Sequence, residues 1–366
     1  MKLEAVETVR VPMPLVRPFR TSFGLQVARD VLLVHVRTDV GEGWGEAAAH
    51  AEPYYNEEFV DASQLVIERF LVPAIVARGD FHSSDLSEIF RRVKGYPAAK
   101  AGLEMALLDA ELRAADERLV DALGGVRSAV AVGVSVGITS SIDELVATVD
   151  GYVGDGYQRV KLKIEPGFDI EVLTAVRAAF PDLALQVDAN AAYTSSDLEL
   201  LRRCDHFNLL MIEQPFAVDD LETHAILAAS MATPICLDES IVSLAATRRA
   251  LDAAACSIVN LKVGRLGGVL SAKAVHDFCF ERGVATWCGG MLESGIGRAT
   301  NVALAALPGC VYPGDISASE RYFSQDVTEP FILENSTLAV PRGPGLGVTV
   351  DLEAIRTLGG ISRKVF

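Results

Sequence analysis

From about residue 130 the chain repeats one pattern of hydrophobic and polar positions. A short apolar run is followed by a polar or glycine-containing turn, and then by a stretch whose apolar residues recur every three or four positions. The apolar runs are too hydrophobic to leave one face in water, so the pattern predicts parallel strands alternating with helices. Eight such runs, the number that closes a barrel, are found at 130–137, 159–164, 183–190, 209–215, 234–240, 257–264, 284–290 and 310–316.

An open, doubly wound sheet is the competing architecture. That fold places a glycine-rich phosphate turn, G-x-G-x-x-G, after its first strand. Gly133, Gly137 and the residues after them do not supply this motif. The pattern therefore favours a barrel.

Residues 1–125 have a different pattern. The segments 6–14 and 29–47 alternate like antiparallel strands joined by glycine-containing turns, and 99–117 has a helical period. We expect an α+β module at 1–125, a barrel at 126–328, and a C-terminal segment at 329–366 that returns to the first module.

Composition narrows the class of protein. A net charge of −16 without a long basic run argues against nucleic-acid binding. No apolar stretch approaches the length of a membrane span, and the N-terminus lacks the apolar core of a signal peptide. The six cysteines form no C-x-x-C pair, which indicates buried, reduced thiols. We expect a cytoplasmic protein that binds neither nucleic acid nor membrane.

Charged residues close five of the apolar runs at nearly equal intervals. Successive steps of 25, 25, 25 and 24 residues separate Lys163, Asp188, Glu213, Asp238 and Lys262. One strand–helix unit per step places all five at the carboxyl-terminal rim of a barrel, where the active sites of this fold lie. Ordinary solvated or ion-paired rim charges are the alternative, but three converging carboxylates without a cation would repel one another.

Three oxygen ligands without a neighbouring histidine or cysteine favour a hard cation. The expected ion is Mg²⁺, with Mn²⁺ as a possible substitute, held by Asp188, Glu213 and Asp238. Removal of a proton beside a substrate carboxylate creates a dianionic enediolate, and a general base contributes only about 10²–10⁴-fold. The cation would therefore stabilise the charge, while Lys163 and Lys262 act on the proton from opposite faces. The expected partner is a small carboxylate.

Two further side chains share the inward face. Lys161 precedes Lys163 by two residues, and Asn190 follows Asp188 by two, so each pair projects to one side of its strand. A second ammonium should lower the pKa of Lys163. Lys161 could alternatively bind a substrate carboxylate directly or form a bridge to an aspartate or asparagine.

At these residues the chain resembles the enolase superfamily, which uses lysine or histidine bases with Mg²⁺. Within it, the chain is similar to the muconate lactonizing subgroup and above all to the o-succinylbenzoate synthase/N-acylamino acid racemase family. The resemblance implies a (β/α)₇β TIM-like barrel with an α+β capping domain, of α/β class, formed by the N-terminal segment and the C-terminal tail. It rests on PFRTSFG (18–24), GEGWGE (41–46), RVKLKIEPG (159–167), LQVDANAAYT (185–194), IEQP (212–215), CLDESI (236–241), NLKVGRLGG (260–268), WCGGMLESGIGRATN (287–301) and PGDISAS (313–319).

The resemblance also implies roles for individual residues. In the synthase reaction Lys163 removes the α-proton and then protonates the departing hydroxyl, while Lys262 stabilises the enediolate. In the racemase reaction both lysines exchange protons with Cα. Arg265 matches an arginine of racemase-competent members, which makes both activities an expectation; a rim ion pair is the alternative.

Substrate contacts are implied less directly. Phe19 and Phe23 lie in a segment that caps the substrate in the family, and Met291 and Leu292 match a region that lines it, although loop packing would also explain the phenylalanines. Ser135, which ends the first barrel strand, could meet the substrate or cap a turn.

Three rival functions remain. A dipeptide epimerase would carry Asp-x-Asp at the eighth strand, where this chain has Asp315-Ile316-Ser317. The GGMLESG stretch does not favour a muconate cycloisomerase, and a non-enzymatic scaffold barrel would have lost some of the five rim residues. A homo-oligomer is expected, with its size left open.

Overall fold

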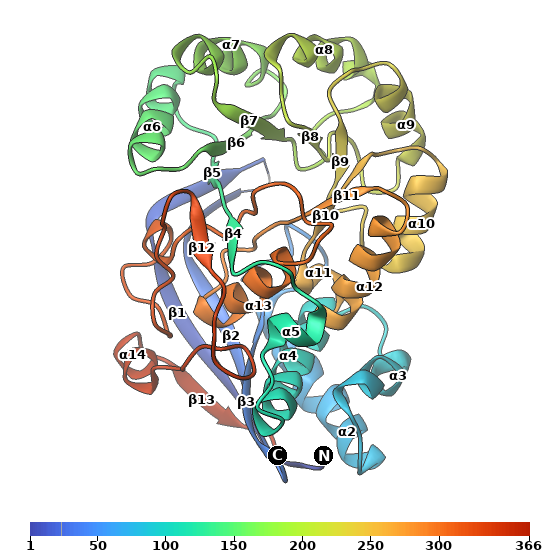
Figure 1. Cartoon of the computed structure of the whole chain (residues 1–366), viewed down its shortest axis with the longest axis vertical. Helices are drawn as coiled ribbons and strands as arrows, with labels where there is room; N and C mark the ends of the chain where they lie inside the picture. Colours follow the sequence, from blue (N-terminus) through green and yellow to red (C-terminus); the bar gives the residue numbers. More distant parts are fainter. Residues whose placement is uncertain (23) are drawn as a thin grey trace.

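The computed structural model describes residues 1–22 and 24–366, arranged as a barrel and a smaller cap (Figure 1). Phe23, one of the expected substrate contacts, lies outside the described residues. The cap is built on an antiparallel sheet of order β13-β1-β2-β3. Its last strand in sequence, β13, pairs with β1, so the C-terminal tail completes the sheet. The strands are β1 (Leu3–Thr21), β2 (Gly24–Thr38), β3 (Gly41–Ala47) and β13 (Ile361–Lys364).

Five helices complete the cap, and the longest of them, α4, packs directly against β3. Glycines allow this close approach, because a Cβ added at Gly45 would lie 2.1 Å from the carbonyl oxygen of Gly102. The four-stranded antiparallel sheet, with α4 packed against it, thus forms a stable platform beside the barrel. The helices are α1 (Val60–Val66), α2 (Val72–Arg78), α3 (Leu86–Ile89), α4 (Pro97–Ala114) and α5 (Leu119–Leu123).

The barrel contains a parallel sheet of order β11-β10-β9-β8-β7-β6-β5, so each strand lies beside its neighbour in sequence. Its side chains are buried along nearly every strand, as expected for a sheet covered on both sides. The α/β class, the barrel and the cap predicted from the sequence are confirmed. The strands are β5 (Val134–Val136), β6 (Arg159–Lys163), β7 (Ala184–Asp188), β8 (Ile212–Glu213), β9 (Ile235–Leu237), β10 (Ile258–Leu261) and β11 (Ala285–Cys288).

Two predicted strands differ from the structure. The run at 310–316 forms isolated parallel bridges, Thr286 with Cys310 and Val132 with Gly314, rather than a continuous eighth strand. The run at 130–137 is divided, because β4 (Ala129–Ala131) pairs with β12 (Thr337–Ala339) outside the barrel and only β5 joins the parallel sheet. Proline and glycine interrupt the eighth run. Its backbone therefore forms hydrogen bonds with the strands on both sides but not a regular ladder.

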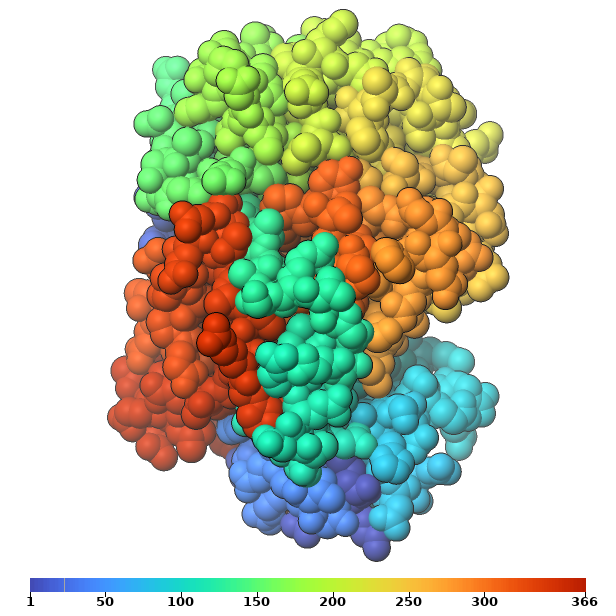
Figure 2. Space-filling view, viewed as in Figure 1, coloured from blue at the N-terminus to red at the C-terminus, as the bar shows by residue number. Residues whose placement is uncertain are grey.

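Helices after the strands surround the barrel (Figure 1). Several begin at a side chain that accepts a backbone N–H, such as Ser141 for α6 and Ser243 for α10. In Figure 2 the C-terminal residues, in red, cover one flank beside the blue-green α5. The main barrel helices are α6 (Ile142–Gly154), α7 (Ile170–Ala179), α8 (Leu198–Arg202), α9 (Leu221–Ala229), α10 (Leu244–Asp252), α11 (Val263–Leu266), α12 (Val269–Phe280) and α13 (Gly295–Ala305).

All six cysteines are buried and unpaired with one another, as the sequence indicated. Within residues 1–22 and 24–366, no helix has both the length and the apolar character needed to cross a membrane.

Candidate active site

The structure brings the five evenly spaced residues to one end of the barrel. Lys163 pairs with Asp188 across β6 and β7, and Asp188 pairs with Glu213 across β7 and β8. Asp238 and Lys262 directly follow β9 and β10. All five side chains are buried, so their charges interact in a medium that screens them poorly.

Lys163 is held by an aspartate and an asparagine. Its Nζ donates to Oδ2 of Asp188 and to Oδ1 of Asn190, both at 2.6 Å. Asn190, predicted to share the inward face, also donates from its backbone N to Asp188 Oδ1 at 3.0 Å. Burial lowers the pKa of Lys163, the positive charge of Lys161 lowers it further, and Asp188 opposes both. The direction matches the expectation from the sequence, with burial as the larger cause.

Lys161 bridges acidic residues. Its Nζ lies 3.0 Å from Asp188 Oδ2, 2.9 Å from Glu213 Oε2 and 2.5 Å from Asp315 Oδ2. Burial by itself would lower the pKa of Lys161, but these three carboxylates raise it well above its ordinary value. Of the roles considered for Lys161, bridging to aspartates is the one observed. Its ammonium also lies 5.1 Å from the ring centre of Trp287.

Lys262 and Arg265 share Asp238. Lys262 Nζ donates to Asp238 Oδ2 at 2.7 Å, and the Arg265 guanidinium forms an ion pair with Asp238 Oδ1. Tyr55, from the cap, places its hydroxyl 3.3 Å from Lys262 Nζ. Burial opposes the charged form of Lys262, yet Tyr55, Glu239 and other acidic neighbours raise its pKa. Arg265 is itself buried, so its ion pair lies within the site and not on an exposed rim.

The three carboxylates provide the donor set for a divalent ion. Among the described residues, no three carboxylate, imidazole or thiolate groups stand close enough together to hold a metal as they lie. Ammonium and guanidinium groups lie between them, including the Arg265 guanidinium that pairs with Asp238 Oδ1. Hard oxygen donors on three adjacent strands fit a divalent ion. Binding one would require Asp188, Glu213 and Asp238 to exchange cationic partners for the ion.

A cavity of about 50 Å³ opens above the two lysines. Of the residues singled out in the sequence, those in its wall are Phe19, Ser135, Lys161, Lys163, Asn190, Lys262, Met291 and Leu292. Sequence reasoning missed the other wall residues, which are Thr21, Gln26, His50, Tyr55, Gly290, Asp315 and Tyr322. Gln26, His50 and Tyr55 come from the cap, where no strand–helix period marks functional positions. Asp315 did carry a signal, because it closes the eighth apolar run.

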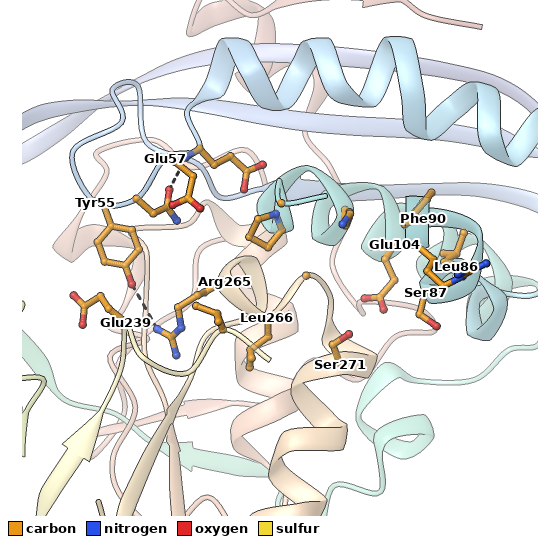
Figure 3. A pocket seen from close by; sticks show the side chains of 18 of the residues that line it. Tyr55, Glu57, Leu86, Ser87, Phe90, Glu104, Glu239, Arg265, Leu266 and Ser271 are labelled. Atoms are coloured by element: carbon orange, nitrogen blue, oxygen red, sulfur yellow. Dashed lines mark hydrogen bonds between the residues drawn. The ribbon is translucent and has the colours of Figure 1, made fainter. Parts of the chain in front are cut away.

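A larger cleft of about 780 Å³ adjoins this cavity between the cap and the barrel. Tyr55 belongs to the walls of both. Figure 3 shows the Tyr55 hydroxyl directed at the Arg265 guanidinium, 3.5 Å away, with Glu239 beside them. Tyr55 thus separates the buried lysines from the outer cleft. Arg265 faces this cleft and contacts Asp238 and Tyr55, and Tyr55 also lines the inner cavity.

Two lysines and three carboxylates at the mouth of a capped barrel are typical of enzymes that remove a proton beside a carboxylate. Comparison with known protein families points to the same class of enzyme. Residues 144–355 match the enolase C-terminal domain-like family. Residues 4–124 match the N-terminal domain of the mandelate racemase/muconate lactonizing enzyme family. The chain belongs to the enolase superfamily. Enzymes of this superfamily use a divalent metal ion.

Particular relatives narrow the comparison. The chain is 52% identical over 349 residues to an N-succinylamino acid racemase from Amycolatopsis sp, covering 95% of each chain. It is 44% identical over 353 residues to an o-succinylbenzoate synthase from Geobacillus kaustophilus, covering 96% of this chain and 94% of the relative. A solved structure described as an unknown member of the enolase superfamily, from Enterococcus faecalis V583, is 41% identical, with a TM-score of 0.93 over 100% of both chains.

Proposed function

We propose that the protein is an o-succinylbenzoate synthase that also racemises N-succinyl amino acids. The observation that carries the proposal is that Lys163 and Lys262, from β6 and β10, line one buried cavity, while Asp188, Glu213 and Asp238 occupy the strand ends between them. Two amines on opposite sides of a substrate can exchange a proton at either face of the same carbon. The relatives at 52% and 44% identity bear the names of the two activities.

In the dehydration, Lys163 takes the proton from the carbon beside the substrate carboxylate. The C–H electron pair then forms the new double bond, the C–O bond to the neighbouring hydroxyl breaks, and Lys163 returns the proton to that oxygen as water leaves. Lys262 remains charged and stabilises the negative charge that develops meanwhile. In racemisation, one lysine removes the Cα proton and the other delivers a proton to the opposite face.

The metal in this proposal is Mg²⁺, held by Asp188, Glu213 and Asp238, with Mn²⁺ as a substitute. When bound, it would supply positive charge to the substrate carboxylate as the α-proton leaves. Carboxylate ligands on a rigid sheet are the donors that this ion prefers. Lys161 keeps two of these carboxylates and Asp315 in fixed positions.

Substrate contacts follow from the cavity wall. Phe19, Met291 and Leu292 supply apolar surface. Ser135 Oγ is buried and has no hydrogen-bond partner among the described residues, so it can contact a polar group of the substrate. Arg265 acts on the reaction through Asp238 and Lys262.

Racemisation alone is the second candidate function, favoured by the 52% identity to a racemase. The two are separated by incubating the purified protein with Mg²⁺ in D₂O, with the hydroxycyclohexadiene substrate and with N-succinyl amino acids in parallel. Formation of both o-succinylbenzoate and Cα-deuterated amino acid of inverted configuration is expected. Deuteration without dehydration would make the protein a dedicated racemase, and neither product would refute both functions.

The remaining expectations stay predictions. They are a small carboxylate as the partner, no binding of nucleic acid or membrane, assembly as a homo-oligomer, and a cytoplasmic location.

A further inference from the structure

A buried glutamine connects the three strands at whose ends the acidic residues of the site lie. Gln214 directly follows β8, which ends at Glu213, and it is fully buried. Strands β7, β8 and β9 lie side by side (Figure 1). The proton transfer and the metal ligation proposed above use no atom of Gln214, so its position at the centre of this group has to be explained in another way.

The backbone of Gln214 leaves the ladder between β8 and β9 before the ladder reaches Asp238. Its N–H donates to the Cys236 oxygen at 2.9 Å, and in a regular parallel ladder its own backbone oxygen would then accept the N–H of Asp238. Instead φ of Gln214 is 36°, in the left-handed region, and its oxygen accepts the N–H of Ala191, in the segment after β7, at 2.8 Å. This conformation is unfavourable for a residue other than glycine, so the surrounding structure must maintain it.

The side chain of Gln214 supplies the hydrogen bond that its backbone does not make. Oε1 accepts the N–H of Asp238 at 3.0 Å and the N–H of Ser240 at 3.2 Å. Nε2 donates to the backbone oxygen of Phe216 at 3.0 Å and to Ser240 Oγ at 2.8 Å. Backbone N–H groups only donate and backbone oxygens only accept, so these partners determine the orientation of the amide. The glutamine amide thus replaces a peptide group and holds Asp238 at the end of β8.

This connection fixes two of the three proposed metal ligands relative to each other. Glu213 is joined to Gln214 by the peptide bond and Asp238 by the side-chain hydrogen bond, and all three residues are buried. Mg²⁺ requires nearly octahedral ligands at about 2.0–2.1 Å, whereas Ca²⁺ accepts more flexible arrangements at about 2.3–2.6 Å. Ligands whose positions cannot adjust therefore favour the smaller ion.

We propose that Gln214 is a positioning residue that holds Glu213 and Asp238 in the arrangement that an ion of the size of Mg²⁺ requires, and so makes the site select this ion over larger divalent ions. The inference rests on the metal site of the proposed function and deepens it, because it assigns the choice of ion to a residue that is not a ligand. A residue with a merely structural role would lower the stability of the protein but would not change the preference among ions.

The test measures the Kd values of Mg²⁺ and Ca²⁺ by isothermal titration calorimetry in wild type and in Gln214→Met. Methionine has a similar length but makes none of the side-chain hydrogen bonds of Gln214. The Kd of Mg²⁺ should rise about 10–100-fold, the usual effect of removing a support of a metal ligand. The Kd of Ca²⁺ should rise less, so the ratio of the Ca²⁺ Kd to the Mg²⁺ Kd should fall about tenfold. Unfolded protein lowers the measured stoichiometry and leaves both Kd values unaltered.

Two further variants separate positioning of the ligands from general support of the loop. Gln214→Glu keeps the acceptor oxygen, and it should retain most of the wild-type ratio because its added charge attracts both divalent ions equally. His224→Leu is the matched control. From α9, His224 Nε2 accepts the N–H of Phe216 on the same loop at 3.3 Å, and Nδ1 contacts the Asp220 oxygen at the start of that helix. This variant should destabilise the protein and leave the ratio unchanged.

Ser240→Ala covers the case in which Gln214→Met does not fold. It removes one acceptor of Gln214 Nε2 and leaves the glutamine in place, so the ratio should fall by about threefold, in line with the loss of one hydrogen bond. A wild-type ratio in Gln214→Met, or in Ser240→Ala where Gln214→Met does not fold, would overturn the proposal, as would an equal fall in His224→Leu. Wild-type protein that binds neither ion would instead refute the metal site of the proposed function.

Discussion

Lys161 and Lys163 donate to the same oxygen, Oδ2 of Asp188, from 3.0 and 2.6 Å. Two residues apart on β6, they point to one face and meet one carboxylate. The two lysines nevertheless differ in their other partners. Lys161 pairs with two further carboxylates, whereas the other partner of Lys163 is a neutral side-chain amide. Lys161 is therefore held as a permanent cation, and Lys163 is the amine that can release its proton.

The first prediction concerns the two catalytic lysines. Lys163→Ala should lower dehydration by about 10²–10⁴-fold, the usual contribution of a general base. Lys262→Ala should lower the rate of racemisation by a similar factor. It should retain Cα deuterium exchange for the one enantiomer whose proton faces Lys163. Proton NMR in D₂O with each enantiomer measures both effects. Lys273→Ala, whose ion pair with Asp277 lies on α12, is the control; exchange of both enantiomers in Lys262→Ala would contradict the assignment.

The second prediction concerns the metal. A divalent ion that binds the folded chain should raise its melting temperature, because ligand at 100 times its Kd adds about 2.7 kcal/mol of stability. Asp238→Asn should remove most of this shift, because the amide offers an ion one neutral oxygen in place of a charged carboxylate. Thermal unfolding with and without Mg²⁺ measures the shift. Glu222→Gln, exposed on α9, should retain it, and an equal shift in both variants would place the ion elsewhere.

Much of the site could be predicted because strand–helix units of nearly constant length repeat along the chain. Lys163, Asp188 and Glu213 occupy paired positions on β6, β7 and β8, which a 25-residue step requires. The spacing could not reveal the orientations of the side chains. The sharing of Asp238 by Lys262 and Arg265 depends on tertiary packing and has no counterpart in the sequence pattern.

The cap side of the cavity could not be predicted in the same way. His50 and Tyr55 lie between β3 and α1, in a segment with neither helical nor strand period. Their function depends on the cap folding back over the barrel, and this contact joins residues more than 200 positions apart, as between Tyr55 and Lys262. Asp315 was considered only as half of an Asp-x-Asp motif, whereas the structure shows it binding Lys161 and Arg159.

The third prediction concerns stability against pH. Glu104 extends from α4 of the cap, and its carboxylate accepts the backbone N–H of Val269, the first residue of α12, at 2.5 Å. Burial raises the pKa of Glu104 to about 8, with the helix N–H groups opposing. An unfolded glutamate titrates near 4.3. Between these values the native state binds the extra proton, so stability should fall as pH rises from about 5 to 8.

Glu104→Gln should remove this contribution, because the amide keeps an acceptor oxygen and cannot ionise. The difference in unfolding free energy between pH 5 and pH 8.5 should shrink by roughly 2–5 kcal/mol in the variant, at about 1.4 kcal/mol for each pKa unit. Urea unfolding at the two pH values provides the measurement. Burial similarly raises the pKa of Glu46 to about 7, so part of the pH dependence should survive. An identical dependence in wild type and variant would show that Glu104 is ionised in the native state.

The fourth prediction concerns the contact between β3 and α4, which supports the cap. A Cβ added at Gly45 would lie 2.1 Å from the Gly102 oxygen and 2.7 Å from the Ala106 nitrogen. Backbone atoms cannot move aside as a flexible side chain can, so Gly45→Ala should destabilise the protein by about 1–3 kcal/mol or more. Gly151→Ala is the matched control, because Gly151 lies in α6 with no atom within 4 Å of an added Cβ. There alanine should stabilise the helix by about 0.5–1 kcal/mol. Chemical denaturation measures the unfolding free energy of both variants. Equal unfolding free energies would contradict the prediction, because they would mean that the strand and the helix can move apart without loss of stability.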